Sequence, residues 1–182
     1  MGIFLSIWYN KIGDFMKKNV LIFSLLFAFI DQVIKYFVIN YLELYKSIKV
    51  IPNFFYLTYT QNDGAAFSIL SGGRWFFVVM GVVALILIVK FISIDRHITK
   101  YDTVAYSLIT GGIIGNLVDR IVYTHVIDYL DFYIFNFDAP IFNFADMCIV
   151  IGAFMILYTL FVRGDLDEDI HGRKRIKWCK MW

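Results

Sequence analysis

The stretch Gly111-Gly112-Ile113-Ile114-Gly115-Asn116-Leu117-Val118-Asp119-Arg120 contains the pattern from which the fold can be predicted. Gly111 and Gly115 fall on one face of a helix, and small residues at this spacing let helix backbones approach closely within a membrane. One further turn brings Asp119 onto the same face. Ionisable groups at membrane depth are costly and generally serve a function. The stretch therefore predicts a closely packed membrane helix that ends at a functional carboxylate.

The composition indicates an integral membrane protein. Of the 182 residues, 60% are hydrophobic, and the mean hydropathy is +0.68. A soluble domain is only about half apolar. Apolar runs close to the roughly 20 residues of a membrane span are expected at about 20–39, 75–94, 103–118 and 147–162. The predicted fold is an all-α membrane protein, a bundle of four transmembrane helices.

The distribution of basic residues predicts the orientation. Most of the 17 Lys and Arg residues lie before the first span, between the second and third, or after the fourth. By the positive-inside rule, both termini are cytoplasmic and the segments 40–74 and 119–146 lie outside. The chain then divides into a cytoplasmic extension (1–19), a membrane domain (20–163) and a basic cytoplasmic tail (164–182). We expect the tail to contact anionic membrane lipid rather than nucleic acid, with a simply solvated tail as the alternative.

A second carboxylate, Asp146, opens the fourth span at a depth similar to that of Asp119. Helix rise places Asp146 roughly 26 Å and Asp119 roughly 24 Å from the cytoplasmic ends of their helices, near the outer boundary of the membrane. We predict that they form a catalytic pair. The alternative is structural: Asn143 caps the helix, the helix dipole favours Asp146, and Asp119 is a solvated helix end.

Two further polar groups accompany this pair. Asp31 and Lys35 are one helical turn apart and are expected to pair on one face. The β-branched and aromatic segment 48–60 predicts strands, and it leads to Asn62 and Gly64, which either form a turn or hold a peptide backbone.

Two close carboxylates resist joint ionisation. One keeps a proton while the other, ionised, can activate a water molecule. The histidines are scattered, so neither a metal nor a cofactor is expected.

Five motifs together resemble bacterial lipoprotein signal peptidase, also called signal peptidase II. They are Asp31-Gln32-Val33-Ile34-Lys35, Asn62-Asp63-Gly64-Ala65-Ala66-Phe67, the stretch 111–120, Val126-Ile127-Asp128-Tyr129 and Phe142-Asn143-Phe144-Ala145-Asp146. The resemblance covers about residues 20–162. It implies an intramembrane aspartyl endopeptidase of the bacterial inner membrane that removes signal peptides from diacylglyceryl-modified prolipoproteins, cutting before the lipidated cysteine.

The resemblance also implies roles for individual residues and a small extracytoplasmic β-rich cradle. Asp119 and Asp146 would be the catalytic pair. The residues that would shape the site or hold the substrate are Asp31, Lys35, Asn62, Gly64, Ala65, Asn116, Arg120, Asp128 and Asn143.

Two other classes of function are compatible with membrane carboxylates. One is a proton-coupled carrier or channel in which Asp31, Lys35, Asp119 and Asp146 form a relay, although two carboxylates at one boundary do not step across the bilayer. The other is a non-catalytic membrane assembly factor with structural aspartates. Replacing either aspartate of the predicted pair by Asn discriminates, because only a peptidase loses turnover while it stays folded.

Overall fold

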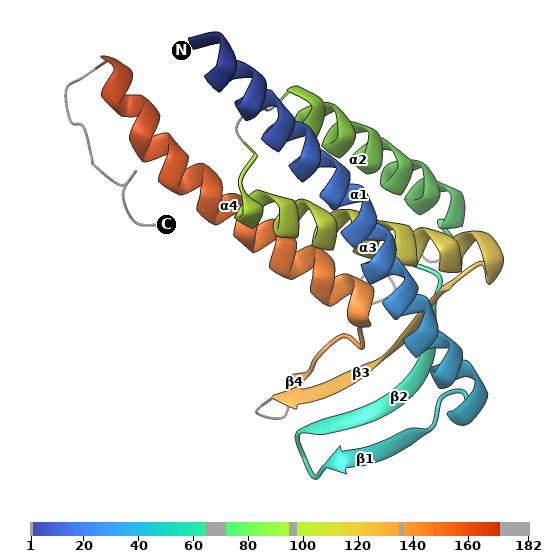
Figure 1. The fold of residues 1–182 in the computed structure, drawn as a ribbon. Coiled ribbons are helices and arrows are strands. Elements are labelled where there is room, and N and C mark those ends of the chain that lie inside the picture. Colours follow the sequence, from blue (N-terminus) through green and yellow to red (C-terminus); the bar gives the residue numbers. More distant parts are fainter. Residues whose placement is uncertain (1, 65–71, 95–97, 135–136, 172–182) are drawn as a thin grey trace.

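The computed structural model describes residues 2–64, 72–94, 98–134 and 137–171. The elements in chain order are α1 (Gly2–Tyr41), β1 (Ser47–Ile51), β2 (Phe55–Asn62), α2 (Arg74–Ile94), α3 (Lys100–Val122), β3 (Val126–Ile134), β4 (Phe137–Asp138) and α4 (Phe144–His171). In Figure 1 the strands gather at one end of the helices, and the first turns of α1 and the last turns of α4 lie at the other end.

Three helical segments within the described ranges are long and apolar enough to cross a membrane: Met16–Tyr41, Arg74–Ile94 and Phe144–Phe161. They overlap the first, second and fourth predicted spans. The predicted third span lies in α3, whose buried positions include polar residues such as Ser107 and Asn116. The central α3 packs against α1, α2 and α4, so its polar residues can be buried against other helices. These polar residues make α3 less apolar than the other three helices. A fourth crossing stays a prediction.

Helix boundaries differ from the predicted spans. At the start of α3, Thr99 and Asp102 form a capping box, in which the Asp102 N–H donates to Thr99 Oγ1 at 3.2 Å and the Thr99 N–H donates to Asp102 Oδ2 at 2.9 Å. The helix continues to Val122, so Asp119 lies inside its last turn. Likewise, α1 begins at Gly2, and the predicted N-terminal extension continues directly into the first membrane helix.

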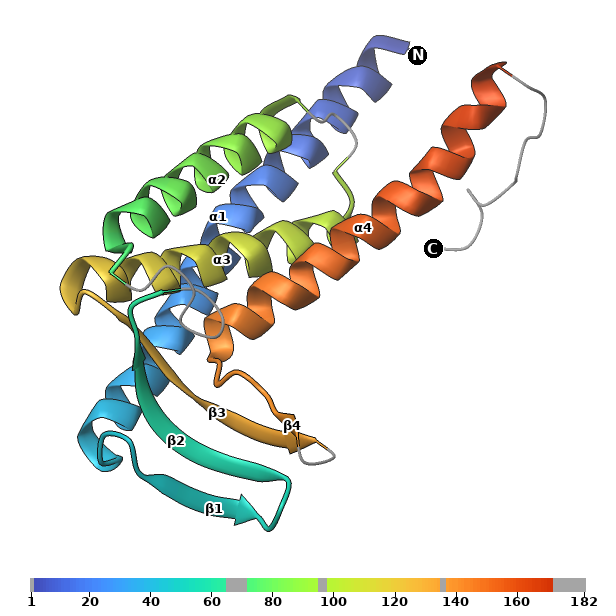
Figure 2. The ribbon, with the colours of Figure 1, turned by 180° about the vertical axis from the view of Figure 1, so that it is seen from behind.

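The strands form one antiparallel sheet in the order β1-β2-β3-β4 (Figure 2). The predicted strands over 48–60 are confirmed as β1 and β2, whereas β3 lies in a segment whose secondary structure we had not predicted. Buried Tyr59, Ile127 and Tyr129 pack the sheet against Val38 of α1. The sheet is therefore fixed to the end of the helix that carries Lys35.

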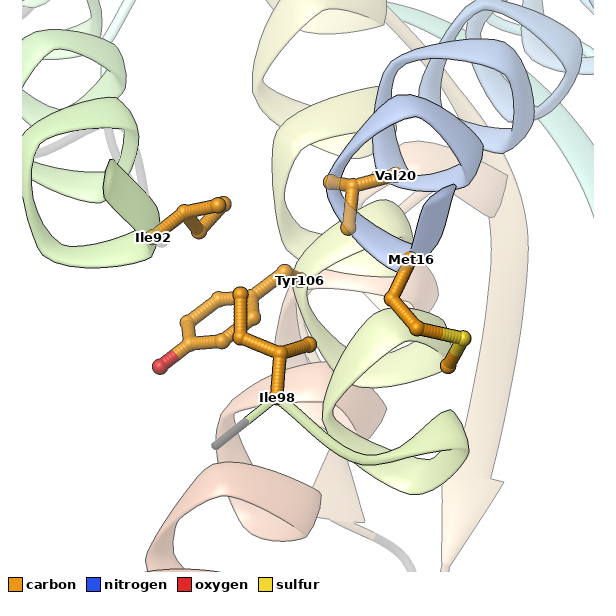
Figure 3. Close-up of a cluster of buried hydrophobic side chains, with 5 residues drawn as sticks. All are labelled: Met16, Val20, Ile92, Ile98 and Tyr106. Atoms are coloured by element: carbon orange, nitrogen blue, oxygen red, sulfur yellow. The ribbon is translucent and has the colours of Figure 1, made fainter. Parts of the chain in front are cut away.

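At the opposite end of the helices, a second hydrophobic cluster joins α1, α2 and α3. Figure 3 shows its side chains, which are Met16, Val20, Ile92, Ile98 and Tyr106. Along α1, the polar residues Asp31 and Lys35 lie between the two clusters, which include Met16 and Val20 on one side and Val38 on the other.

The predicted close approach at the glycines is confirmed. A Cβ atom added at Gly111 would lie 2.8 Å from the Ser24 carbonyl oxygen and 2.7 Å from Phe27 Cβ, both on α1. Added at Gly112 or Gly115, it would overlap the Ala145 carbonyl oxygen or the Asp31 carboxylate, respectively. These glycines let α3 approach α1 and α4 at backbone distance.

We predict that Gly111→Ala lowers the melting temperature in detergent, because α1 backbone must move away; overpacking of this kind costs about 1–3 kcal/mol. Gly81→Ala is the matched control. There the added Cβ would approach Leu117 Cδ2 at 2.8 Å, the end of a flexible side chain that can rotate away. Thermal unfolding followed by circular dichroism measures both. If both variants lost the same number of degrees in melting temperature, contact with the α1 backbone would not be the reason that Gly111 resists a larger side chain.

Candidate active site

The most deeply buried charges form a cluster around Lys35. Its Nζ lies 2.8 Å from Asp31 Oδ2, 2.7 Å from Asp119 Oδ2 and 3.0 Å from Asn116 Oδ1. Lys35 is 1% exposed and both aspartates are 0% exposed. An ammonium group has three N–H donors, and each one here meets one oxygen. The predicted Asp31–Lys35 pair is confirmed, and Lys35 also binds Asp119, which residue spacing did not predict.

The other contacts of Asp119 are internal as well. Its Oδ1 accepts a hydrogen bond from Gln32 Nε2 at 2.8 Å, and its Oδ2 accepts one from the Ile127 N–H at 3.1 Å. The carboxylate therefore joins α3 to α1 and to the start of β3. Its charged partner is the Lys35 ammonium.

A polar cavity of about 220 Å³ lies between α3, the sheet and the start of α4. Its lining consists of Asn62, Gly64, Asn116, Arg120, Val126, Asp128, Pro140, Ile141, Phe142 and Asp146. Two carboxylates, Asp128 and Asp146, thus border one space, and Asp119 is not among the lining residues. The structure brings Asp146 together with Asp128; the predicted pairing of Asp119 with Asp146 stays a prediction that these contacts do not support.

Each oxygen of the Asp128 and Asp146 carboxylates accepts one hydrogen bond. Asp128 Oδ1 accepts from Asn143 Nδ2 at 2.7 Å, and Asp128 Oδ2 accepts from Asn62 Nδ2 at 2.9 Å. Asp146 Oδ1 accepts from Asn116 Nδ2 at 2.8 Å, and Asp146 Oδ2 accepts from the Asn143 N–H at 3.2 Å. Because a carboxylate oxygen has two lone pairs, each can accept one more hydrogen bond, from water or substrate.

The orientation of each of these three amides follows from its neighbours. Asn62 Oδ1 accepts from the Gly64 N–H at 3.0 Å, which confirms the predicted turn, and Asn143 Oδ1 accepts from the Asp146 N–H at 3.0 Å. Asn116 Oδ1 faces the Lys35 ammonium. Ammonium and backbone N–H groups only donate, so an oxygen must face each of them and every NH₂ group points toward a carboxylate.

The first turn of α4 is fully capped. Asn143 is the predicted cap, the Phe144 N–H donates to the Tyr129 hydroxyl at 3.2 Å, and the Ala145 N–H donates to Asp31 Oδ1 at 3.1 Å. These bonds satisfy N–H groups that a helix start leaves without partners. Asp146 takes part in the cap, as the structural alternative predicted, and it also borders the cavity.

Asp128 has the electrostatics of an acid that keeps its proton near neutral pH. It is 2% exposed; burial, and then the negative charge of Asp146, raise its pKa to about 7, although hydrogen bonds from Asn62 and Asn143 oppose the change. On another wall, Arg120 lies over the Phe77 ring at 5.0 Å and donates to the Gly64 carbonyl oxygen at 3.3 Å. A cation and a protonated acid therefore border the same space.

Two further cavities adjoin the first. One, of about 370 Å³, is apolar and is lined by Phe142, Asp146, Met147, Val150 and Ile151. The other, of about 380 Å³, is lined by Tyr45, Thr60, Gln61, Asn62, Asp128, Pro140 and Ile141. The carboxylate pair thus has an apolar space on the α4 side and a mixed one on the β2 side. Ala65, also predicted to shape the site, lies outside the described residues.

Fold and site together define a class: a multi-pass helical membrane protein with a hydrogen-bonded carboxylate pair beside a small sheet. The model of the family described as Signal peptidase (SPase) II matches residues 23–162. The lipoprotein signal peptidase of Alteromonas mediterranea is 43% identical over 153 residues, which covers 82% of this chain and 84% of that protein. That of Staphylococcus aureus is 38% identical over 155 residues, covering 85% and 94%.

Solved structures agree with the sequence matches. A bacterial membrane enzyme solved by the in meso method at 2.3 Å resolution is 34% identical, with a TM-score of 0.75 and coverage of 87% of this chain and 94% of that one. A second such structure, at 1.9 Å resolution, is 36% identical, with a TM-score of 0.70 and coverage of 78% and 91%. The chain belongs to the signal peptidase II family, and the resemblance predicted from its motifs is confirmed.

We predict that Asp128→Asn raises the melting temperature at pH 8 and raises it much less at pH 5. The ordinary pKa of Asp is about 4, and the folded protein raises that of Asp128 to about 7. Between these values the folded state holds a proton that the unfolded chain has released, so stability falls as the pH rises and the full penalty applies above pH 7. Asn removes that penalty. A lower melting temperature at pH 8 would contradict the raised pKa.

Proposed function

We propose that this protein is an intramembrane aspartyl endopeptidase that removes signal peptides from diacylglyceryl-modified prolipoproteins, with Asp128 and Asp146 as its catalytic pair. The observation that carries the proposal is the shared cavity: both carboxylates border it, and Asn143 donates to both. The family relatives are named lipoprotein signal peptidases, which supports the substrate class. From the resemblance to the family, we further propose that the bond that is cut lies directly before the lipidated cysteine.

The electrostatics support a division of roles within the pair. The raised pKa of Asp128 supports its role as the acid. Because two close carboxylates resist joint ionisation, we assign the role of base to the other carboxylate, that of Asp146. Asp146 accepts a proton from water while the water oxygen bonds to the scissile carbonyl carbon, and Asp128 gives its proton to the carbonyl oxygen. Asp128 then recovers a proton from the tetrahedral intermediate as Asp146 protonates the leaving nitrogen. The C–N bond breaks, which leaves a carboxylic acid and an amine.

The surroundings suit a substrate that is partly in the membrane. The apolar cavity beside Asp146 is lined by Met147, Val150 and Ile151, which also lie on the exposed face of a membrane-crossing helix. An apolar segment or acyl chain would enter there, and Arg120 and Asn62 would contact the peptide backbone. Lys35 and Asp31, which do not line the cavities, would shape the site from α1 without touching the substrate.

The proposed setting is the inner membrane of a bacterium. Four crossings would leave both termini on one side, and the helix ends opposite the sheet agree with this arrangement (Figures 1 and 2). The basic residues that flank the spans favour the cytoplasm for that side. The sheet and the carboxylate pair would then lie at the outer surface, where prolipoproteins are presented.

We predict that Asp128→Asn and Asp146→Asn each lower kcat for cleavage of a diacylglyceryl-prolipoprotein at least ~100-fold, because each removes one proton-transfer group. Asp131→Asn is the matched control. Asp131 lies on the same strand and is equally buried at 2% exposure, but it binds Thr58 and does not line the cavity. It should keep most of the activity. The assay uses purified, folded protein in detergent or liposomes.

Asp119→Asn distinguishes the two possible pairs. With Asp128 and Asp146 as the pair, this variant is less stable, because Lys35 loses one partner, but it retains more turnover than Asp128→Asn. The opposite ranking, with Asp128→Asn active and Asp119→Asn inactive although folded, would restore Asp119 to the pair. Normal cleavage by all three variants would show that the aspartyl mechanism is wrong, and a folded parent that never cuts would favour the carrier or the assembly factor.

A further inference from the structure

We propose that Lys35 is a positioning residue, whose ammonium group fixes the orientation of the Asn116 amide and thereby the hydrogen bond that holds the Asp146 carboxylate. The inference rests on the proposed function, because it concerns the same carboxylate pair. Lys35 does not line the cavities that border the pair, so it acts from outside the space that the substrate would occupy.

The contacts form a chain from α1 through α3 to α4. Lys35 Nζ donates to Asn116 Oδ1 at 3.0 Å, and Asn116 Nδ2 donates to Asp146 Oδ1 at 2.8 Å. The two ends of one amide group are therefore used, one for the lysine and one for the carboxylate. Since the amide is planar and rigid, fixing its oxygen also fixes the direction of its NH₂ group.

Among the groups that donate to Asn116 Oδ1, Lys35 contributes most to excluding the opposite amide orientation. It would bring an NH₂ group against the ammonium and an oxygen against the carboxylate of Asp146. The second donor to Asn116 Oδ1 is the neutral Asn143 Nδ2, at the longer distance of 3.3 Å. Hydrogen bonds with a charged donor are roughly twice as strong as neutral ones, so the lysine dominates the choice.

The two aspartates that bind Lys35 hold its side chain in place. Its other two donors meet Asp31 at 2.8 Å and Asp119 at 2.7 Å. Replacing the lysine by an apolar residue would leave both buried carboxylates without a counter-ion, which is costly. This gives Asp119 a role that does not require contact with the substrate: it holds the group that orients Asn116.

The test must separate orientation from charge and from folding. Lys35→Met alone would leave two unpaired buried carboxylates, so the variant used is Lys35→Met with Asp31→Asn. The cluster then keeps the same net charge, because one positive and one negative group are removed together. Asp31→Asn alone is the control that retains the lysine, and Ser24→Ala, which removes another fully buried polar group of α1, controls for stability.

The first readout is the pH dependence of kcat for cleavage of a diacylglyceryl-prolipoprotein. Loss of one hydrogen bond to a carboxylate should move the acid limb of the profile upward by about one pH unit in the double variant. Asn116→Leu should give a shift of similar size in the parent and none when added to the double variant, since both changes remove the same bond. Ser24→Ala should leave the profile in place.

A role limited to folding would appear differently. It would lower the melting temperature and the active fraction and leave the pH profile unchanged, and that result would overturn the proposal. Additive shifts from Asn116→Leu and the double variant would also overturn it, because the lysine would then act on the pair independently of Asn116.

A second readout does not depend on cleavage and so remains decisive if the proposed function fails. In protein labelled with ¹⁵N at asparagine, the Asn116 side-chain amide is assigned from its absence in Asn116→Leu. Its NH₂ protons should exchange slowly with water in the parent and in Asp31→Asn, and at least ~10-fold faster in the double variant, consistent with loss of a buried hydrogen bond of about 1.4 kcal/mol or more. Unchanged exchange in the double variant would show that Lys35 does not orient the amide.

Discussion

The arrangement of the helices depends on three charged side chains that contact one another in one buried cluster. Two carboxylates, from Asp31 and Asp119, and the ammonium of Lys35 are almost completely buried. Removing such ions from water costs several kcal/mol each, and only precise mutual contacts offset the cost. Here the contacts come from α1 and α3, and Asp31 also accepts the Ala145 N–H of α4. The charges can therefore be satisfied only when three helices meet in one register, which Gly115 permits by leaving room for the Asp31 carboxylate.

The geometry of the carboxylate pair follows from this register. Asp146 lies one residue after Ala145, whose N–H is bound to α1, and Asp128 lies one residue after Ile127, whose N–H is bound to Asp119. The backbone on each side of the cavity is thus tied to the buried ion cluster, and Asn143 joins the two carboxylates directly. Donors that are held in place before substrate binds need no reorganisation during the reaction. The costly ion cluster stabilises that arrangement.

Local patterns in the sequence predicted the features that depend on spacing along the chain. The Asp31–Lys35 pair, the Asn143 cap, the glycine contacts of α3 and the strands before Asn62 are of this kind, and all are present. The partner of Asp119 was missed, because matching depth in the membrane does not say toward which neighbour a side chain points. A buried acid within the apolar run 126–130 was the available signal for Asp128, but its approach to Asp146 depends on how β3 meets α4. The polar residues of α3 make this helix less apolar than the other three, and the sequence alone does not show that neighbouring helices cover them.

Burial alone does not bring an aspartate beside a second carboxylate, as two residues of β3 show. Asp128 and Asp131 are both 2% exposed. Asp131 Oδ2 is 2.5 Å from Thr58 Oγ1, and its Oδ1 has no hydrogen-bond partner among the described residues. Asp128 instead has an amide donor on each oxygen, the charge of Asp146 nearby and a cavity in front of it. When a second carboxylate lies nearby, the two groups resist joint ionisation and one of them keeps a proton. In the proposed mechanism the chemistry therefore belongs to the place where β3 meets α4, and of these two aspartates only Asp128 lies there.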